Sequence, residues 1–325
     1  MTMSANRLQL DFAQALDAYL RYAPRLPQVA PDAVPKATDY VDNLLAIADQ
    51  FDLIVFDAFG VLNSGQSAIP GAVKTVATLQ EMGKKIAVVT NDASSSGEAI
   101  LARHRKRGFD FDNNSLISSQ QFVAPLMGEY ADITHWGAMA PTDWPFDILP
   151  GRVEPLGSDS ALYDAVGGFL LIDSDSWTDT QQALLEQSLK DSPRPVLVGN
   201  PDICAPMGDF LSVESGYFAH LAGDASGVMP QCVGKPYHHV FEEVLKRHPG
   251  VDRSRVLMVG DTVHTDVLGG LASGIKTLLV HQGGFLDGQD IEGVFARSGL
   301  RPHFCARAIG HGIEDDADGI AAKSA

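Results

Sequence analysis

Carboxylate side chains follow two short strand-like runs in this chain, at the points where each run ends. Asp57 comes directly after the apolar residues 53–56, and Asp261 follows residues 255–259 and a single glycine. Asp266 lies on the same loop, five residues further on. A carboxylate buried at the end of a strand costs free energy unless a partner compensates its desolvation. Two carboxylates on such a loop suit a hard cation, so these spacings predict a ligand- or cation-binding site.

Thr90, Asn91 and Lys235 are candidates to complete that site. Thr90 and Asn91 follow the run 85–89, and a threonine hydroxyl can donate to a phosphoryl oxygen. Lys235 immediately precedes Pro236, which favours the first turn of a helix and would hold the lysine at the mouth of that helix. Each signal alone is equally typical of a turn or of a solvated surface lysine. Their order along the chain is therefore what gives them weight.

The elements that must position these residues alternate between strand and helix. Residues 53–56 predict a strand buried on both faces, a helix opens after Pro70, and residues 85–89 predict the next strand. This unit is typical of a doubly wound parallel sheet. The carboxyl edge of such a sheet is where ligands bind, and Asp57 and Thr90 would both lie there.

A second set of strand and helix patterns occupies the middle of the chain. Residues 168–172 and 195–198 predict strands, with a helix over 178–190 between them. The second strand ends in Asn200-Pro201-Asp202, a sequence that also favours a plain turn. This set predicts a separate α/β unit inserted into the first one.

Two helices are predicted ahead of the first strand. Apolar residues recur at helical spacing over 8–20, and a second helix is expected over 38–49 with Thr38 as its N-cap. The prolines between residues 24 and 35 exclude a helix from the segment that joins them. The residues of this arm suggest no chemistry.

The organising stretch of the chain resembles the haloacid dehalogenase superfamily. Residues 57–62, Asp-Ala-Phe-Gly-Val-Leu, are similar to the nucleophile motif of its phosphatases, Asp-x-Asp-Gly-Val-Leu. Phe59 stands where that motif has its second aspartate. The later motifs of the superfamily are matched in order by Thr90, Lys235, Asp261 and Asp266.

The inserted unit resembles the cap of the class IIA branch, which includes the NagD and pyridoxal phosphatases. Asn200-Pro201-Asp202 matches a loop that recurs in those caps. The resemblance covers about residues 49–284 and implies an α/β fold, a doubly wound parallel-sheet (Rossmann-like) core with an inserted α/β cap domain. The expected parts are an N-terminal helical arm (1–48), the core (49–124 and 230–310), the cap (125–229) and a flexible tail (311–325).

The resemblance also implies a phosphatase that forms an aspartyl phosphate on Asp57. Thr90 and Lys235 would act with this nucleophile, and the lysine would hold carboxylate and phosphoryl group together despite their like charge. The implied substrate-binding residues are Asn91, Asn200, Pro201 and Asp202.

Mg²⁺ is the cofactor that the resemblance implies. Asp57, Asp261 and the backbone carbonyl of Phe59 would bind it, and Asp266 would orient these ligands from behind. Because the Phe59 ligand is a backbone carbonyl, it survives any side chain at that position.

Phe59 removes the side chain that would shuttle protons, and three readings stay open. The protein hydrolyses phosphates slowly, or with a substitute such as His264 or a cap residue. Alternatively it runs another reaction, as the dehalogenase and phosphonatase branches do, or it binds phosphorylated ligands without turnover. The acidic pair Asp261 and Asp266 argues against a dehalogenase, which needs no Mg²⁺, so phosphatase is preferred.

The composition limits the partners. Apolar residues make up 45% of the chain and the net charge is −17, which excludes the basic footprint of a nucleic-acid-binding protein and disfavours anionic membranes. Three widely spaced cysteines form no Cys-x-x-Cys pair, and no run reaches membrane-spanning length. We therefore expect a cytoplasmic protein with a small phosphorylated substrate, and the cap is a candidate surface for homo-oligomers.

Overall fold

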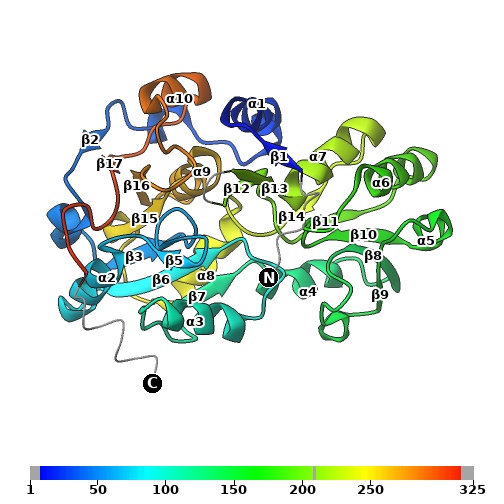
Figure 1. The fold of residues 1–325 in the computed structure, drawn as a ribbon, viewed down its shortest axis with the longest axis horizontal. Helices are drawn as coiled ribbons and strands as arrows, with labels where there is room; N and C mark the ends of the chain where they lie inside the picture. The colour runs from blue at the N-terminus through cyan, green and yellow to red at the C-terminus, as the bar shows by residue number, and fades with distance from the viewer. Residues whose placement is uncertain (1–7, 208–209, 316–325) are drawn as a thin grey trace.

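The computed structural model describes residues 8–207 and 210–315 as two parallel sheets with helices on their faces (Figure 1). The larger sheet has seven strands in the order β2-β17-β16-β15-β3-β6-β7, and every neighbouring pair is parallel. Its strands are β2 (Asp39–Tyr40), β3 (Leu53–Phe56), β6 (Lys85–Thr90), β7 (Leu116–Ser118), β15 (Val256–Gly260), β16 (Lys276–Val280) and β17 (Phe304–Ala306). Its helices are α2 (Ala72–Glu81), α3 (Gly97–Lys106), α8 (His238–Arg247), α9 (Leu268–Ala272) and α10 (Ile291–Ser298).

Strand β3 alternates its four residues between two apolar layers. Leu53 and Val55 pack with α8, whereas Ile54 and Phe56 pack with α2 and α3, and all four are fully buried. A strand covered on both faces needs a continuous apolar run instead of an alternating one. Burial contributes about 1.5–3 kcal/mol for each large apolar side chain, which fixes the end of β3, and therefore Asp57, in place.

The strand order brings the ends of β3 and β15 together. From β3 the chain proceeds to β6 and β7 on one side, leaves the sheet, and returns as β15, β16 and β17 on the other side. Neighbouring strands that lead off in opposite directions create a crevice at their carboxyl ends, where ligands bind in open α/β sheets. The loops after β3 and β15 both open into this crevice.

The second sheet has five parallel strands in the order β14-β11-β10-β8-β9. The strands are β8 (His135–Met139), β9 (Arg152–Pro155), β10 (Gly168–Leu171), β11 (Val196–Val198) and β14 (Gln231–Cys232). Helices α4 (Gln120–Gly128), α5 (Ser160–Ala165), α6 (Asp179–Asp191) and α7 (Ser215–Ser226) accompany it. The predicted fold class, a doubly wound parallel sheet with an inserted α/β unit, is confirmed.

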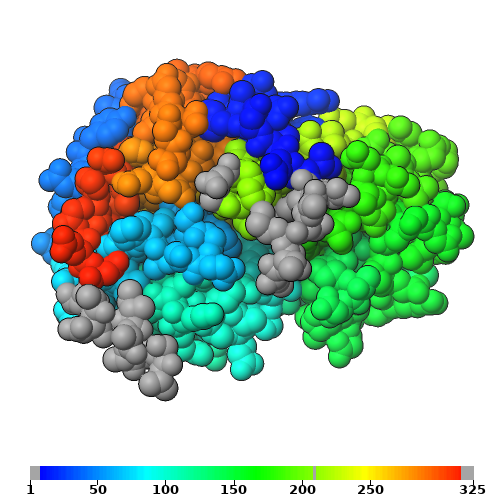
Figure 2. Space-filling model, in the orientation of Figure 1, coloured from blue at the N-terminus to red at the C-terminus, as the bar shows by residue number. Residues whose placement is uncertain are grey.

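A hydrophobic cluster joins the N-terminal arm to the core and to the inserted unit. Helix α1 (Phe12–Tyr22) begins at a capping box on Asp11 and buries Leu16 and Tyr19 among residues of the core and of the inserted unit. Strand β1 (Gln9–Leu10) pairs with β13 (Leu211–Val213), which pairs with β12 (Cys204–Pro206). Figure 2 shows the dark blue arm lying between the orange part of the core and the green inserted unit. The first predicted helix is therefore confirmed.

The second predicted helix, 38–49, is wrong. Strand β2 occupies Asp39–Tyr40 because this segment extends the large sheet beside β17. Only Leu44–Gln50 is helical, as a 3₁₀ helix capped by the Asn43 side chain, which accepts from the Leu45 N–H. Pairing with a neighbouring strand thus overrides a local apolar spacing that favours a helix.

The short remaining elements and the predicted boundaries complete the fold. Strands β4 (Asn63–Ser64) and β5 (Ser67–Ala68) form a hairpin after the Asp57 loop. The boundary predicted at residue 125 falls inside α4, which carries Pro125. In the predicted tail, Asp315 accepts hydrogen bonds at the start of α2, and residues 316–325 lie outside the described part. No described helix is long and apolar enough to cross a bilayer.

Candidate active site

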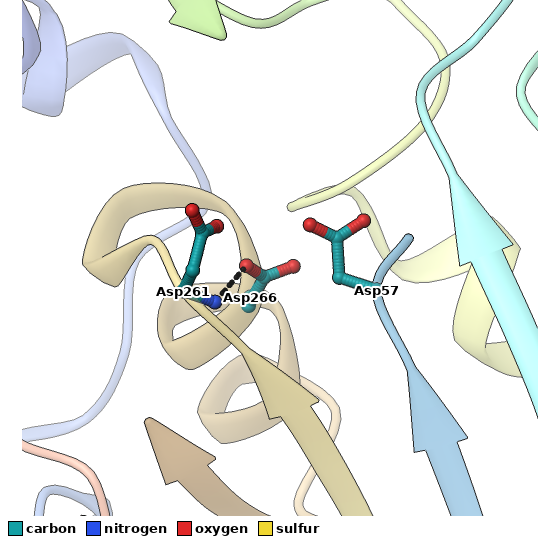
Figure 3. A group of neighbouring side chains, drawn as sticks. All are labelled: Asp57, Asp261 and Asp266. Carbon is teal, nitrogen blue, oxygen red and sulfur yellow. Dashed lines mark hydrogen bonds between the residues drawn. The ribbon is translucent and has the colours of Figure 1, made fainter. Parts of the chain in front are cut away.

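Three acidic side chains meet in the crevice between β3 and β15. Asp57 follows β3, Asp261 follows β15, and Asp266 lies in the π-helical turn Val263–Val267 (Figure 3). Each offers a carboxylate oxygen, and these oxygens all lie within 4.8 Å of one another. The two strands deliver Asp57 and Asp261 in register, because the Asp57 N–H donates to the Val259 carbonyl at 2.9 Å.

Lys235 is the cation that balances part of this charge. Its ammonium forms an ion pair with Asp57 Oδ1 and a second one, at 2.8 Å, with Asp266 Oδ1. The other oxygen of Asp266 accepts from the N–H groups of Asp261 and Thr262, at 3.1 Å each. Burial opposes the charged lysine, but Asp266 and Asp57 outweigh it and hold the pKa of Lys235 above its ordinary value.

The acids nonetheless outnumber the cation. Burial, reinforced by Asp266 and Asp261, raises the pKa of Asp57 well above its ordinary value despite the opposing effect of Lys235. Burial and the neighbouring Asp266 raise the pKa of Asp261 to about 7, although the Phe285 N–H donates to it at 2.7 Å. Such a cluster favours a further positive charge.

The donor set fits a magnesium ion. Asp57 and Asp261 present carboxylate oxygens, which are the hard ligands that Mg²⁺ prefers. Asp266 has both oxygens engaged by Lys235 and by backbone N–H groups, so it orients the loop and the lysine instead of offering a ligand. Gly60 turns the Asp57 loop with φ 77°, and a Cβ atom there would lie 2.1 Å from Asp261 Oδ2. Only glycine permits this close approach of the two loops.

Thr90 and Asn91 emerge from β6 at the same edge. The Thr90 hydroxyl lies against the next turn, where it accepts from the Asp92 N–H at 3.2 Å. Asp92 in turn accepts from the N–H groups of Ser94 and Ser95 and pairs with Arg103, which fixes the loop. Both Thr90 and Asn91 are buried, and both line the cavity described below.

The Asn91 amide connects three parts of the site. Its Oδ1 accepts from the Lys235 N–H at 2.7 Å, and its Nδ2 donates to the Lys235 carbonyl at 3.0 Å and to Asp202 Oδ1 at 2.8 Å. Gly234, with φ 93°, makes room for it, since a Cβ atom there would lie 2.4 Å from Asn91 Oδ1. Asn91 therefore positions Lys235 and ties the cap to the core.

The predicted cap loop faces the core across this amide. Asn200 accepts from the Asp202 N–H at 3.1 Å and donates to Glu214 at 3.0 Å, so it orients both acids. Burial raises the pKa of Asp202 to about 6, with Lys235 and the hydrogen bond from Asn91 acting in the opposite direction. Pro201 packs against the start of α7. A Cβ atom at Gly216 would lie 2.1 Å from the Pro201 carbonyl oxygen, so this close contact requires glycine.

A cavity of about 190 Å³ lies between the core and the cap loop. Asp57, Thr90, Lys235 and Asp261 contribute its core side. Phe59, which is partly buried, also lines the cavity. The sequence-predicted residues on the cap side are Asn200 and Asp202. Among the lining residues that sequence reasoning missed are Tyr19 of the arm and Asp173, Asp175, Cys204 and Glu214 of the inserted unit.

One of the missed residues carried a readable signal. Asp173 follows the end of β10 much as Asp57 follows β3, so the strand-end rule could have found it. Tyr19 carried none, because it belongs to the apolar stripe of α1 and reaches the cavity only through the packing of the arm.

His264, the predicted substitute shuttle, does not line the cavity. Its ring stacks on Tyr19 with centroids 4.9 Å apart, and neither ring nitrogen has a hydrogen-bond partner among the described residues. Burial lowers its pKa to about 4, so the ring is neutral at physiological pH. His264 is therefore a packing residue beneath the arm.

The parallel sheet, Asp57 at the end of β3, and Lys235 and Asp261 beside it are the arrangement of a hydrolase of the haloacid dehalogenase type. A family model described as haloacid dehalogenase-like hydrolase matches residues 54–140, and a second, HAD-hydrolase-like, matches residues 232–308. The chain belongs to this superfamily, in its NagD-like class IIA branch.

Several known proteins with similar sequences or folds are named as phosphatases. The 4-nitrophenylphosphatase of Schizosaccharomyces pombe is 26% identical over 242 residues, covering 67% of this chain and 79% of that protein. A possible sugar phosphatase from Cytophaga hutchinsonii shares the fold with a TM-score of 0.74 and 24% identity, over 84% of this chain and 99% of that one. A glycerol phosphate phosphatase of Mycobacterium tuberculosis, solved with magnesium, has a TM-score of 0.64 and 21% identity, over 83% and 78%.

Proposed function

We propose that the protein is a Mg²⁺-dependent phosphatase that hydrolyses a small phosphorylated metabolite through an aspartyl phosphate on Asp57. One observation carries this proposal: Asp57 is held against the Lys235 ammonium in the wall of a cavity of about 190 Å³. A carboxylate nucleophile next to a fixed cation suits attack on a phosphoryl group. The phosphatase names of its relatives support the same reaction class.

The residues of the site divide the work of phosphoryl transfer. Asp57 Oδ2, the oxygen that Lys235 does not contact, would attack phosphorus, while Lys235 offsets the charge of the nucleophile and the phosphoryl group. Thr90 would donate a hydrogen bond from its hydroxyl to a phosphoryl oxygen. Asn91 would keep Lys235 in place through the two hydrogen bonds to its backbone. Positioning and charge neutralisation account for most of the rate in this reaction class.

Asp57 and Asp261, with the carbonyl of Phe59, are the residues that would hold Mg²⁺. The ion supplies positive charge that neutralises the phosphoryl oxygens. Its positive charge would also reduce the electrostatic repulsion among the carboxylates of Asp57, Asp261 and Asp266. The magnesium in a phosphatase of this fold supports the assignment.

The presence of Phe59 supports a second candidate function, in which the protein binds phosphorylated ligands without hydrolysing them. The phenylalanine cannot hold or move a proton, and general acid–base help is worth about 10² to 10⁴ in rate. The two candidates differ in whether any phosphate ester is hydrolysed.

The decisive assay measures phosphate release from a panel of phosphate esters, with and without Mg²⁺. A phosphatase should release phosphate from at least one ester in Mg²⁺ and lose this activity in a chelator. The Asp57→Asn variant should be inactive, whereas Asp52→Asn, at the other end of β3 and outside the cavity, should retain activity. A folded wild-type protein that binds esters yet hydrolyses none would establish the binding function instead.

A further inference from the structure

The cavity lacks an obvious proton donor for the departing alcohol. In the motif that residues 57–62 resemble, the proton donor is an aspartate at the position of Phe59, and His264 lies outside the cavity. An alkyl phosphate releases a strongly basic alkoxide unless a proton arrives during bond breaking. The described cavity-lining acids, phenol and thiol, apart from the nucleophile and its immediate partners, are Tyr19, Asp92, Asp173, Asp175, Asp202, Cys204 and Glu214. Asp92 is committed to Arg103 and to the N–H groups of Ser94 and Ser95.

Most of these groups are unsuited to both giving and taking a proton. Glu214 is committed to Asn200 and Ser212, with both of its oxygens engaged. Burial raises the pKa of Tyr19 and of Cys204 well above their ordinary values, so neither would act as a base near neutral pH. Asp173 accepts from the Asp175 N–H at 2.8 Å on the cap side, and within residues 8–207 and 210–315 no hydrogen bond or ion pair connects it to Lys235.

Asp202 differs because a single side chain ties it to the nucleophile's cation. Asn91 donates to Asp202 Oδ1 at 2.8 Å and also bonds the backbone of Lys235, whose ammonium touches Asp57. Asn200 fixes the Asp202 backbone from the cap side. Asp202 Oδ2 has no hydrogen-bond partner among the described residues, and the residue lines the cavity. One oxygen is thus anchored and the other is available.

We propose that Asp202 is the proton donor and acceptor of this enzyme, replacing from the cap the acid that Phe59 removes from the core. This inference rests on the proposed phosphatase function. It assigns a catalytic role to a residue of the cap loop, so the cap would complete the reaction chemistry as well as enclose the substrate.

The proton balance runs through two steps. In the first, an Asp57 oxygen bonds to phosphorus, the bond from phosphorus to the ester oxygen breaks, and that oxygen takes the proton of the Asp202 carboxyl, which leaves an alcohol and an Asp202 carboxylate. In the second, water attacks phosphorus, Asp202 takes a proton from it, and the bond from phosphorus to Asp57 breaks. Phosphate departs with both aspartates restored, so the net reaction is ester hydrolysis.

The surroundings of Asp202 suit this exchange. The titratable groups that act on it or respond to it are Lys235 and Asp266 of the core, Cys204 of the cap and Tyr19 of the arm. Burial raises its pKa to about 6, against the opposing effect of Lys235. A carboxyl that titrates near the working pH can serve as acid in one step and as base in the next.

The test compares Asp202→Asn with wild type on glycerol phosphate and 4-nitrophenyl phosphate in Mg²⁺. Asparagine keeps an oxygen for Asn91, so the variant preserves the anchor and loses only the proton. kcat/KM reports steps up to the first irreversible one. It should fall by about 100-fold or more for glycerol phosphate and by less than about three-fold for 4-nitrophenyl phosphate, whose leaving group needs no proton.

The second step gives an independent readout. Hydrolysis of the aspartyl phosphate would lose its base, so kcat for 4-nitrophenyl phosphate should fall and the first turnover should show a burst of nitrophenolate. Asp173→Asn, a matched acid on the cap side of the cavity, should give neither the leaving-group split nor the burst. Melting temperatures establish that both variants are folded.

The outcomes distinguish a failure of the Asp202 role from a failure of the phosphatase function. Equal losses of kcat/KM on both esters, without a burst, would mean that Asp202 only positions Asn91 and would overturn this inference while leaving the phosphatase intact. A folded wild-type protein that hydrolyses neither ester would overturn the proposed function and this inference together.

Discussion

The core side and the cap side of the cavity are built in different ways. On the core side, Asp57, Lys235 and Asp266 expose 14%, 3% and 1% of their side chains and are locked by ion pairs at the ends of buried strands. On the cap side, Asp202 and Glu214 are oriented by Asn200 through single hydrogen bonds. The core therefore holds its charges in ion pairs, whereas the cap offers Asp202, which has one oxygen anchored by Asn91 and the other available to a substrate.

The largest expected difference between the two sides is in stability. Lys235→Met would leave two buried carboxylates without their cation, and removing one partner of a buried pair costs about 3–5 kcal/mol. Urea denaturation of the metal-free protein measures this loss. The matched control is Lys246→Met. The side chain of Lys246 is 80% exposed beside Glu243, so this change should alter stability by less than about 0.5 kcal/mol. Similar small losses from both variants would show that the core charges are not locked.

A smaller effect should appear in the pH dependence of stability. Asp202 has a folded pKa of about 6, above the value near 4 that an unfolded aspartate has. The folded state therefore binds this proton more tightly, and the stabilisation is complete below about pH 4 and is lost as the pH rises through about 6. Relative to Asp202→Asn, wild type should lose about 1–3 kcal/mol more between about pH 4.5 and 7.5. Parallel curves for the two proteins would contradict a titrating cap acid.

Phe59→Asp sharpens the comparison by moving a proton donor back to the core. The ring lines the cavity and is only partly buried, so a carboxylate there can be hydrated. In the Asp202→Asn background this change should raise kcat/KM for glycerol phosphate by about ten-fold or more. Unchanged kcat/KM in a variant with normal melting would indicate that position 59 cannot reach the leaving oxygen.

The smallest expected effect concerns the arm that spans the two sides. Asp224 of α7 accepts from Arg21, Tyr22 and Arg25, so it fastens the arm to the cap. Asp224→Asn should lower the free energy of unfolding by about 1 kcal/mol, because this carboxylate is largely covered. Asp17→Asn, which breaks an exposed pair with Arg297 of the core, should have no measurable effect. The reverse ranking would place the arm's main anchor on the core.

The difference between the core side and the cap side of the cavity also explains which site residues could be predicted from the sequence. Asp57 and Asp261 were readable because a buried parallel strand needs a continuous apolar run and ends at the ligand edge. The role of Asn91 as a clamp and the presence of Tyr19 were not, since both depend on how distant segments dock. The wrong helix over 38–49 has the same cause, because β2 forms only where β17 offers an edge.

The central claim is that Asp57 carries the phosphoryl group between the two steps. The direct measurement is mass spectrometry of protein quenched in acid during turnover of 4-nitrophenyl phosphate in Mg²⁺, with Asp57→Asn as the control. We expect one phosphoryl group on the peptide that contains Asp57, enriched in the Asp202→Asn variant and absent from Asp57→Asn. Product formation without any phosphorylated peptide, or with the phosphoryl group on another residue, would contradict the account.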